Sequence, residues 1–180
     1  MSTMLPIVIQ ICGIGAMIFC IGAFLTKNRK TILLMQVVGM GLWTVHFLLS
    51  GNYAGAAMNG LAVVRALVYV NRDKYKWANA KPVPVISAAI FIGVGLFTRY
   101  LGDNLWFLPA IAMTITSFGL FFRDEQKMRF INLFSSPPWI VYNALAPSIP
   151  AVITESLIMV SVIVALILYR KKDSLAKTNK

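Results

Sequence analysis

The chain has 180 residues, of which 58% are hydrophobic and 13% are charged. Soluble domains are typically about 45–50% apolar and about 25% charged, so this composition excludes an ordinary soluble domain and indicates an integral membrane protein. The length allows one membrane domain, residues 1–180, without a sizeable soluble domain beside it. The N-terminal MSTMLPIVIQ has no basic region, so we expect no cleaved signal peptide.

Seven stretches of the chain are apolar enough to form membrane-spanning helices. A helix needs about 20 apolar residues to cross the hydrocarbon core of a bilayer. The spans are expected at about residues 5–26, 31–49, 54–70, 83–99, 104–122, 129–145 and 150–169. The predicted fold class is therefore an all-α membrane protein with seven transmembrane helices.

The formal net charge of +11 is concentrated in alternate loops. Basic residues gather after the first, third and fifth spans, in KNRK (27–30), in RDKYK (72–76) with Lys81, and at Arg123, Lys127 and Arg129. A basic tail, residues 171–180, follows the last span. Positive residues beside spans mark the cytoplasmic side, so we expect the N-terminus outside and the C-terminus in the cytoplasm. They also favour anionic lipid headgroups as partners, and argue against nucleic acid.

The two halves of the chain align when the sequence is shifted by 96 residues. The aligned pairs are Lys27 and Arg123, Gln36 and Asn132, Gly39 and Ser135, Met40 and Ser136, Trp43 and Trp139, His46 and Tyr142, and Asn59 and Glu155. Because spans and loops also fall in register, we predict a repeated unit of three helices. The first unit covers about residues 5–70 and the second about 104–170, and the helix at about 83–99 links them. Equivalent helices are four spans apart, so both units have the same orientation, as in a parallel repeat.

Two segments carry a family resemblance. HFLLSGNYAGA (46–56) and WIVYNALAPSIPAVITES (139–156) resemble the YgjV-type family of small bacterial inner-membrane proteins. The three-plus-one-plus-three arrangement with an external N-terminus also looks like the SWEET sugar transporters and the wider PQ-loop superfamily. These resemblances imply a multi-pass protein of the bacterial inner (cytoplasmic) membrane, in which each unit packs its helices in the order 1-3-2.

The resemblance to SWEET-like transporters also implies a binding site. In those proteins a central cavity between the units holds a small polar solute. Asn residues on each third helix bind the solute, and Trp residues on each second helix cover it. The matching positions here are Asn59 and Glu155, with Trp43 and Trp139. The chain lacks the Pro-Gln dipeptide and has Glu at one of the Asn positions, and these departures argue against a sugar as the solute.

Several polar residues lie within the apolar spans. An ionisable residue inside the membrane usually faces a cavity or a partner, so Glu155 is interpreted as a cavity carboxylate that binds a solute or a proton. The alternative is a structural pair, for which Arg65 is the candidate across about one and a half helical turns of depth. For Asn59 the alternative is a hydrogen bond between helices. Asn143 adds an amide to the same region as Glu155.

Four aromatic or imidazole side chains complete the candidate binding residues. Trp43 and Trp139 suit stacking on a solute, with anchoring at the membrane interface as the alternative. His46 and Tyr142 follow one turn later in the two aligned spans. A lone His is more often structural than a ligand, and no Ser or Asp arrangement beside it would make a catalytic triad.

Two spans contain residues that weaken a helix. Pro137 and Pro138 interrupt the amide hydrogen bonding of the sixth span, and Gly39 and Gly41 lie at nearly matching places in the second. Bending at these candidate hinges would let one unit move against the other. Close packing of helices at small residues is the alternative.

The favoured function is a small transporter or facilitator that moves a small polar solute by alternating access. The alternative is a non-transporting membrane scaffold or regulatory subunit. An enzyme is not expected, because the sequence has no HExxH motif and no nucleophile elbow. Cys12 and Cys20 without a His cluster make no metal site, and no cofactor motif is visible. The oligomeric state stays open, with a homo-oligomer as one alternative.

Overall fold

The structure is a computed structural model that describes residues 4–146 and 148–178. The described chain folds as helices joined by short loops. The α-helices are α1 (Met4–Leu25), α2 (Arg29–Leu49), α3 (Tyr53–Val70), α4 (Pro82–Tyr100), α5 (Phe107–Phe121), α6 (Glu125–Leu133), α7 (Ser136–Leu145) and α8 (Ile149–Thr178), and a short 3₁₀ helix, η1 (Lys76–Asn79), precedes α4. The predicted basic tail continues α8, and its last two residues, 179–180, lie outside the described residues.

Five helices, α1, α2, α3, α4 and α8, are long and apolar enough to cross a membrane. The other two predicted spans are less regular. Helix α5 is apolar but has only 15 residues, so it is about 22 Å long against a hydrocarbon core of about 30 Å. The sixth predicted span consists of α6 and α7 in succession, interrupted at Phe134 and Ser135. The prediction of an all-helical, multi-pass membrane protein is confirmed for the described chain, with five long apolar helices, one shorter apolar helix and one interrupted helix at the seven predicted spans.

Polar caps fix where several helices begin. The Asn28 side chain accepts a hydrogen bond from the backbone N–H of Lys30 at 2.9 Å, and the Asp124 side chain accepts one from the backbone N–H of Lys127 at 2.8 Å. These bonds satisfy amides at the first turns of α2 and α6 that have no partner within the helix. The sixth span was expected to begin at residue 129, because the charged residues in the first turn of α6 interrupt the apolar pattern. The Asp124 cap extends this helix to Glu125.

The helix boundaries recur at the predicted shift of 96 residues. Helices α1 and α5 end at Leu25 and Phe121, which are 96 positions apart. The range Arg29–Leu49 of α2 corresponds in the same way to the combined range of α6 and α7, residues 125–145. Helices α3 and α8 begin at positions 53 and 149, again 96 apart. The internal similarity of the sequence therefore extends to where each helix starts and stops.

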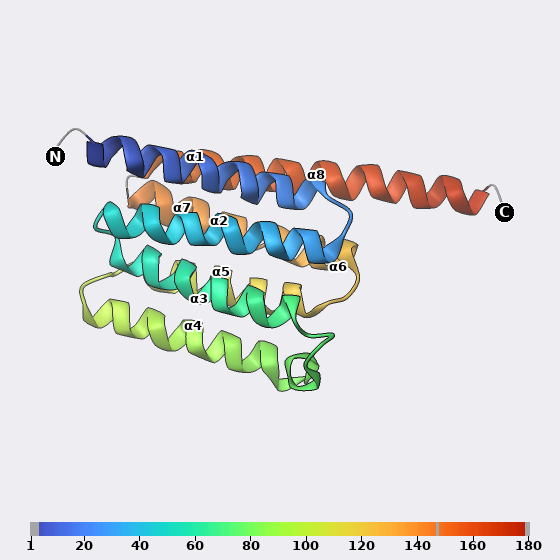
Figure 1. Cartoon of the computed structure of the whole chain (residues 1–180), viewed down its shortest axis with the longest axis horizontal. Coiled ribbons are helices and arrows are strands. Elements are labelled where there is room, and N and C mark those ends of the chain that lie inside the picture. Colours follow the sequence, from blue (N-terminus) through green and yellow to red (C-terminus); the bar gives the residue numbers. More distant parts are fainter. Residues whose placement is uncertain (1–3, 147, 179–180) are drawn as a thin grey trace.

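The helices form a closed ring with one helix outside it (Figure 1). Around the ring, α1 contacts α2, α2 contacts α3, α3 contacts α5, α5 contacts α6 and α7, α7 contacts α8, and α8 contacts α1. Helix α4 packs outside the ring against α3 and α5. The second helix of each group of three therefore lies between the first and the third, so the order 1-3-2 implied by the resemblance is wrong for this chain. The short loop at 26–28, between α1 and α2, and the one at 50–52, between α2 and α3, make consecutive helices neighbours.

Large apolar side chains cover the outside of the bundle. On α1, Ile11 and Ile18 are 63% and 61% exposed, and on α4 Phe97 is 60% exposed. The buried residues, by contrast, include Gln36 and Asn132, each 4% exposed. A large apolar exterior around a partly polar interior is expected where lipid surrounds the protein.

The two ends of the bundle differ in charge. One end, here called the basic end, carries the loops at 26–28, 71–81 and 122–124, and lies on the same side as the C-terminus (at the right in Figure 1). The other end, here called the opposite end, carries the loops at 50–52 and 101–106 and the N-terminus. The basic residues that the sequence analysis placed in alternate loops therefore gather at one end.

Candidate functional site

A cavity of about 90 Å³ lies inside the helical ring. Its walls come from every element of the ring and not from α4. The lining residues are Cys20, Gln36, Met40, Trp43, Phe47, Asn59, Arg65, Met113, Thr116, Asn132, Ser135, Ser136, Trp139, Asn143, Ala151, Glu155 and Ile158. Amide, hydroxyl, carboxyl and indole groups are thus brought together in the interior of a protein whose exterior is apolar.

Most of the lining is duplicated at the 96-residue shift. Twelve of the seventeen lining residues form six pairs. These pairs are Cys20 and Thr116, Gln36 and Asn132, Met40 and Ser136, Trp43 and Trp139, Phe47 and Asn143, and Asn59 and Glu155. The cavity is therefore built from equivalent positions of the two groups of three helices, with different side chains on its two sides.

The two residues predicted to face each other, Asn59 and Glu155, both line this cavity. The Asn59 amide nitrogen donates a hydrogen bond to the backbone oxygen of Gly55 at 2.9 Å, one turn earlier in α3. The Glu155 carboxyl has the Ser136 hydroxyl as a hydrogen-bonding neighbour across the cavity wall. Cys20 on α1 lies near the same carboxyl.

Arg65 also lines the cavity, but its guanidinium is bonded to α5. Nη1 donates to the Met113 backbone oxygen at 2.8 Å and to the Ser117 hydroxyl at 3.0 Å. Its Cζ atom lies 4.8 Å from the centre of the Phe91 ring. Among the residues that the structure describes, no ion pair joins Arg65 to Glu155. The pair considered in the sequence analysis is not formed, and Arg65 instead fastens α3 to α5.

Trp43 and Trp139 line the cavity from equivalent positions and are each 7% exposed. This burial places both rings inside the bundle, which disfavours their alternative role as interfacial anchors. Each ring has an edge-to-face contact one turn further along its helix. The Trp43 and His46 ring centres are 4.9 Å apart, and those of Trp139 and Tyr142 are 5.7 Å apart.

His46 and Tyr142 themselves do not belong to the cavity lining. The Nδ1 atom of His46 is hydrogen-bonded to the backbone oxygen of Ile9 at 2.9 Å, which joins α2 to α1. The Tyr142 hydroxyl points toward Asp103 and Asn52, as described below. Asn143, the other polar residue predicted in this region, does line the cavity, and its Oδ1 atom is buried without a hydrogen-bond partner among the described residues.

The four candidate hinge residues lie in different surroundings. Pro137 and Pro138 stand in the first turn of α7, directly after the interruption that separates α6 from α7. A proline costs little there because the amides of a first turn have no partner within the helix. Helix α2, by contrast, continues through Gly39 and Gly41. A Cβ atom at Gly39 would meet the Cys20 sulfur at 2.6 Å, so this glycine permits close packing of α2 on α1.

Gln36 and Asn132 were aligned with each other from the sequence but were not predicted as site residues. Both line the cavity and are 4% exposed. Gln36 Oε1 and both polar atoms of the Asn132 side chain have no hydrogen-bond partner within the described chain. Buried amides are usually hydrogen-bonded, so unpaired ones beside a cavity suit binding of a polar solute. The sequence did carry a signal for these two residues, because their side-chain amides occupy aligned positions inside predicted membrane spans.

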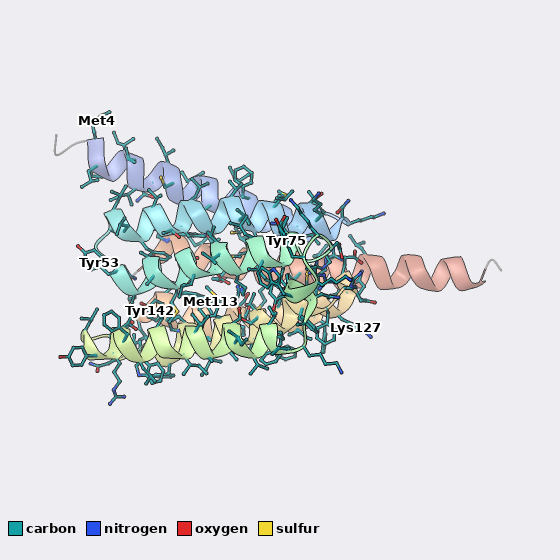
Figure 2. The ribbon with its side chains drawn as sticks, turned by 60° about the horizontal axis from the view of Figure 1, so that its bottom comes forward. Met4, Tyr53, Tyr75, Met113, Lys127 and Tyr142 are labelled. Atoms are coloured by element: carbon teal, nitrogen blue, oxygen red, sulfur yellow. The ribbon has the colours of Figure 1, made fainter. Side chains whose placement is uncertain are left out.

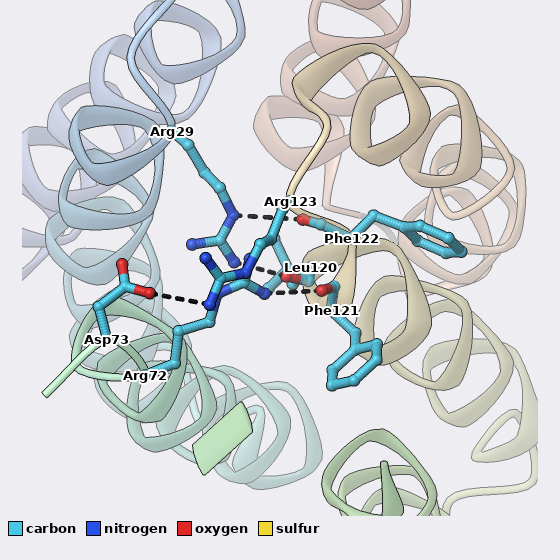
Figure 3. A network of polar contacts seen from close by, with 7 residues as sticks. All are labelled: Arg29, Arg72, Asp73, Leu120, Phe121, Phe122 and Arg123. Atoms are coloured by element: carbon cyan, nitrogen blue, oxygen red, sulfur yellow. Dashed lines mark hydrogen bonds and ion pairs between the residues drawn. The ribbon is translucent and has the colours of Figure 1, made fainter. Parts of the chain in front are cut away.

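A set of arginine side chains closes the basic end by bonding to the ends of helices (Figure 3). Arg29 donates from Nη2 to the Leu120 backbone oxygen at 2.7 Å and from Nε to the Phe122 backbone oxygen at 3.2 Å. Arg72 donates from Nη1 to the Phe121 backbone oxygen at 2.6 Å. These carbonyl groups are the unpaired acceptors at the C-terminus of α5, where positive charge is also favoured by the helix dipole.

An equivalent contact joins an arginine of the second group of helices to the end of a helix in the first group. Arg129, on α6, donates from Nη2 to the backbone oxygen of Thr26 at the end of α1. Thr26 and Phe122 are 96 positions apart, so each group supplies an arginine to the equivalent carbonyl of the other group. We call these bonds of Arg29, Arg72 and Arg129 the basic-end arginine contacts.

The basic-end arginine contacts correct part of the sequence interpretation. Arg72 and Arg129 were interpreted as loop residues facing lipid headgroups, but they are only 3% and 1% exposed. Burial, and then the nearby Arg123 guanidinium, lower the pKa of Arg72 from its ordinary value. Two of the charges that mark the predicted cytoplasmic side therefore act inside the protein, as bonds between the two groups of helices.

At the opposite end, Tyr142 makes the corresponding contacts, with Asn52 of the first group and with Asp103 in the loop before α5. The Tyr142 hydroxyl lies 3.3 Å from Asp103 Oδ2 and 3.5 Å from Asn52 Oδ1. Figure 2 places Tyr142 on the same half of the bundle as Tyr53, and Lys127 and Tyr75 toward the basic end. At these distances the two hydrogen bonds are weak.

The helical ring, the apolar exterior and the central cavity define a multi-pass membrane protein. The chain belongs to the Imp-YgjV family, described as bacterial inner membrane proteins, whose family model matches residues 7–173. It is 28% identical over 145 residues to the inner membrane protein YgjV of Escherichia coli strain K12, covering 79% of this chain and 75% of that protein. No solved structure matches the chain significantly. The predicted YgjV-type family and inner-membrane location are thereby confirmed.

Proposed function

We propose that this protein is a small transporter or facilitator that carries a small polar solute across the inner membrane. The observation that carries the proposal is the cavity: six pairs of equivalent residues surround a space that holds several polar groups between apolar walls, in the middle of a lipid-exposed bundle. A site shared between two equivalent groups is where alternating-access transporters bind their solutes. Glu155, Asn59, Trp43 and Trp139 are the proposed binding residues, and no catalytic step is involved.

The proposal includes a parallel repeat of three helices, with α4 as the linking helix. Helix boundaries that recur at 96 residues support this repeat. So does the pairing of α1 with α8 and of α3 with α5, since one twofold axis would exchange these two contacts. The same architecture favours a place beside the SWEET and PQ-loop transporters, although the helix order within each group differs from theirs.

Alternating access would require the basic-end arginine contacts to break and re-form. With the basic end in the cytoplasm, as the positive-inside rule predicts, the structure corresponds to a state closed on the cytoplasmic side. The exposed basic residues of this end, such as Lys30 and Lys127, would lie beside anionic lipid headgroups. The interruption between α6 and α7 is the proposed point of bending.

Uptake into proteoliposomes tests the proposed function. The assay would compare labelled amines, polyols, amino acids and sugars, with Glu155→Gln as the test variant and Glu125→Gln as the matched control. We expect saturable uptake of at least one solute, reduced about tenfold or more in Glu155→Gln, which corresponds to about 1.4 kcal/mol, and unchanged in the control. Uptake that is unchanged in Glu155→Gln would remove this carboxylate from the mechanism.

A non-transporting scaffold or regulatory subunit is the second candidate. It is favoured by the bonds that Arg65 and Asn59 make to backbone oxygens, because these polar groups already have structural roles. A scaffold predicts no flux of any solute by correctly folded protein. It also predicts that Glu155→Gln alters stability or partner binding instead.

A further inference from the structure

The central cavity leaves more hydrogen-bond acceptors than donors without a partner among the described residues. The acceptors are Gln36 Oε1, Asn132 Oδ1 and Asn143 Oδ1, and the donors are Asn132 Nδ2 and Arg65 Nε. Glu155 is the only acidic residue in its lining. The one lining residue of opposite charge, Arg65, donates from Nη1 to Met113 and Ser117 on α5 and forms no ion pair with Glu155 among the described residues. The carboxylate therefore has no cationic partner from the protein.

Amide oxygens extend the acceptor surface beside this carboxylate. Gln36 Oε1 and Asn143 Oδ1 are buried without a hydrogen-bond partner within the described chain. The Asn59 amide nitrogen is bonded to Gly55, which leaves its amide oxygen as the acceptor for a solute. A buried acceptor without a donor is costly, so a solute that brings N–H groups would relieve several such costs at once.

The aromatic walls add a second attraction for positive charge. Trp43 and Trp139 line the cavity from equivalent positions of the two groups, and Phe47 lies beside Trp43 with ring centres 5.3 Å apart. The face of an indole ring is negatively polarised and binds ammonium and guanidinium groups, more strongly where water is excluded. An anionic solute would be repelled by the Glu155 carboxylate.

The volume of the cavity limits the size of its solute. At about 90 Å³ it is smaller than an engineered apolar cavity of about 150 Å³ that binds benzene. A solute of a few heavy atoms fits this space without rearrangement of the lining.

We infer that the cavity selects a small organic cation with N–H donors, such as a primary amine, held by Glu155, the amide oxygens and the two tryptophans. Only one consequence rests on the proposed function, namely that the bound cation is transported. Binding itself depends on the cavity alone. The inference assigns a substrate class to a site whose family resemblance pointed to a neutral sugar.

Three two-carbon solutes of similar size test the inference: ethanolamine as the cation, ethylene glycol as the neutral solute and glycolate as the anion. Binding to the purified protein in lipid nanodiscs would be followed by tryptophan fluorescence in a Trp77→Phe, Trp106→Phe background, which retains Trp43 and Trp139. We expect ethanolamine to bind at least about tenfold more tightly than ethylene glycol. Glu155→Gln should abolish this preference, and Glu125→Gln should preserve it.

A second measurement covers the case in which the tryptophan variant does not fold. The unfolding temperature of the unmodified protein should rise with ethanolamine and not with equal concentrations of the other two solutes, because a ligand stabilises the state that binds it. Equal or tighter binding of ethylene glycol or glycolate, or an ethanolamine preference that survives Glu155→Gln, would overturn the inference.

Flux of the same three solutes separates this inference from the proposed function. If the protein takes up ethylene glycol or glycolate but not ethanolamine, the cation class is refuted and the transport function stands. Binding of ethanolamine without its uptake would support the cation class and refute transport. If no solute is bound or transported by folded protein, both proposals fail.

Discussion

The two ends of the bundle close the central cavity by different means. At the basic end, Arg29 and Arg72 donate to the last carbonyl groups of α5, and Arg129 donates to Thr26 at the end of α1. At the opposite end, the Tyr142 hydroxyl lies 3.5 Å from Asn52 Oδ1 of the other group and 3.3 Å from Asp103 Oδ2 in the loop before α5. Charged donors on unpaired helix carbonyls are stronger than long hydrogen bonds from a phenol.

This difference suggests which end opens first. Two of the basic-end arginine contacts, those of Arg72 and Arg129, involve buried charges, whose partners are lost only at a large cost. The contacts of Tyr142 are long, so they are lost at a smaller cost. We therefore expect the cavity of this state to communicate with solvent mainly through the opposite end.

The largest expected effect comes from removing the buried charge of Arg129. In Arg129→Met the Thr26 carbonyl loses its donor at the end of α1, and we expect a loss of about 2–3 kcal/mol in the free energy of unfolding. Thermal unfolding in detergent measures the loss. Lys127→Met, on the exposed side of the same helix, is the matched control and should change stability little. Equal stability of the two variants would show that the contact to Thr26 contributes nothing.

A second effect concerns the separation of the two groups at the basic end. In the Arg29→Ala, Arg72→Ala double variant the C-terminal carbonyls of α5 lose both donors. Spin labels at positions 30 and 127, in a Cys12→Ser, Cys20→Ser background, should then report a second and longer distance by pulsed electron resonance. A single distance, identical with and without the two arginines, would contradict their role in closing this end.

Removal of the phenol at the opposite end should have a smaller effect. Tyr142→Phe retains the ring that contacts Trp139 and deletes only the hydroxyl bonds to Asp103 and Asn52. We expect a loss of about 1 kcal/mol or less in unfolding free energy, because the two bonds are long and solvent can replace them. A loss as large as that of Arg129→Met would reverse the comparison between the ends.

The smallest effect is expected for the exposed ion pair of Arg123 and Asp73. Their side chains are 64% and 75% exposed, and the charged atoms lie 3.1 Å apart. Such surface pairs contribute about 0–1 kcal/mol, so Asp73→Asn should change the unfolding free energy by about 0.5 kcal/mol or less. High salt should remove even that difference, and a salt-independent loss would indicate that Asp73 has another role.

The helical regions and the similarity at a shift of 96 residues were accessible from sequence because both depend on local patterns. Apolar runs predicted where the helices lie, and one shift aligned Trp43 with Trp139 and Asn59 with Glu155. The order of helices in the ring was not accessible in this way. It depends on which faces of the helices pack together, and close approaches such as Gly39 on Cys20 leave no local pattern.

The cavity residues were predicted in part, for a geometric reason. Successive residues of an α-helix are rotated by about 100°, so a residue four positions after Trp43 points nearly the same way and a residue three positions after it points about 60° aside. Phe47 accordingly lines the cavity and His46 does not. The same rule separates Asn143 from Tyr142 after Trp139.

The basic-end arginine contacts left no signal in the sequence. Arg29 and Leu120 are 91 residues apart, and Arg129 and Thr26 are 103 residues apart. An arginine beside a span is typical of a cytoplasmic loop, and only the packed ring shows that its partner is the end of another helix. The sequence therefore predicted that these basic residues gather at one end of the bundle, whereas their bonding partners required the tertiary structure.

The accessibility of Cys20 tests the central claim most directly, because this thiol lines the cavity and lies near Glu155. In a Cys12→Ser variant reconstituted in one orientation, a membrane-impermeant thiol reagent would be applied from each side in turn. The account predicts that Cys20 reacts from both sides, faster from the opposite end, and that ethanolamine slows both reactions. A folded protein whose Cys20 reacts from neither side, or at a rate that ethanolamine does not change, would contradict a solute-binding cavity with alternating access.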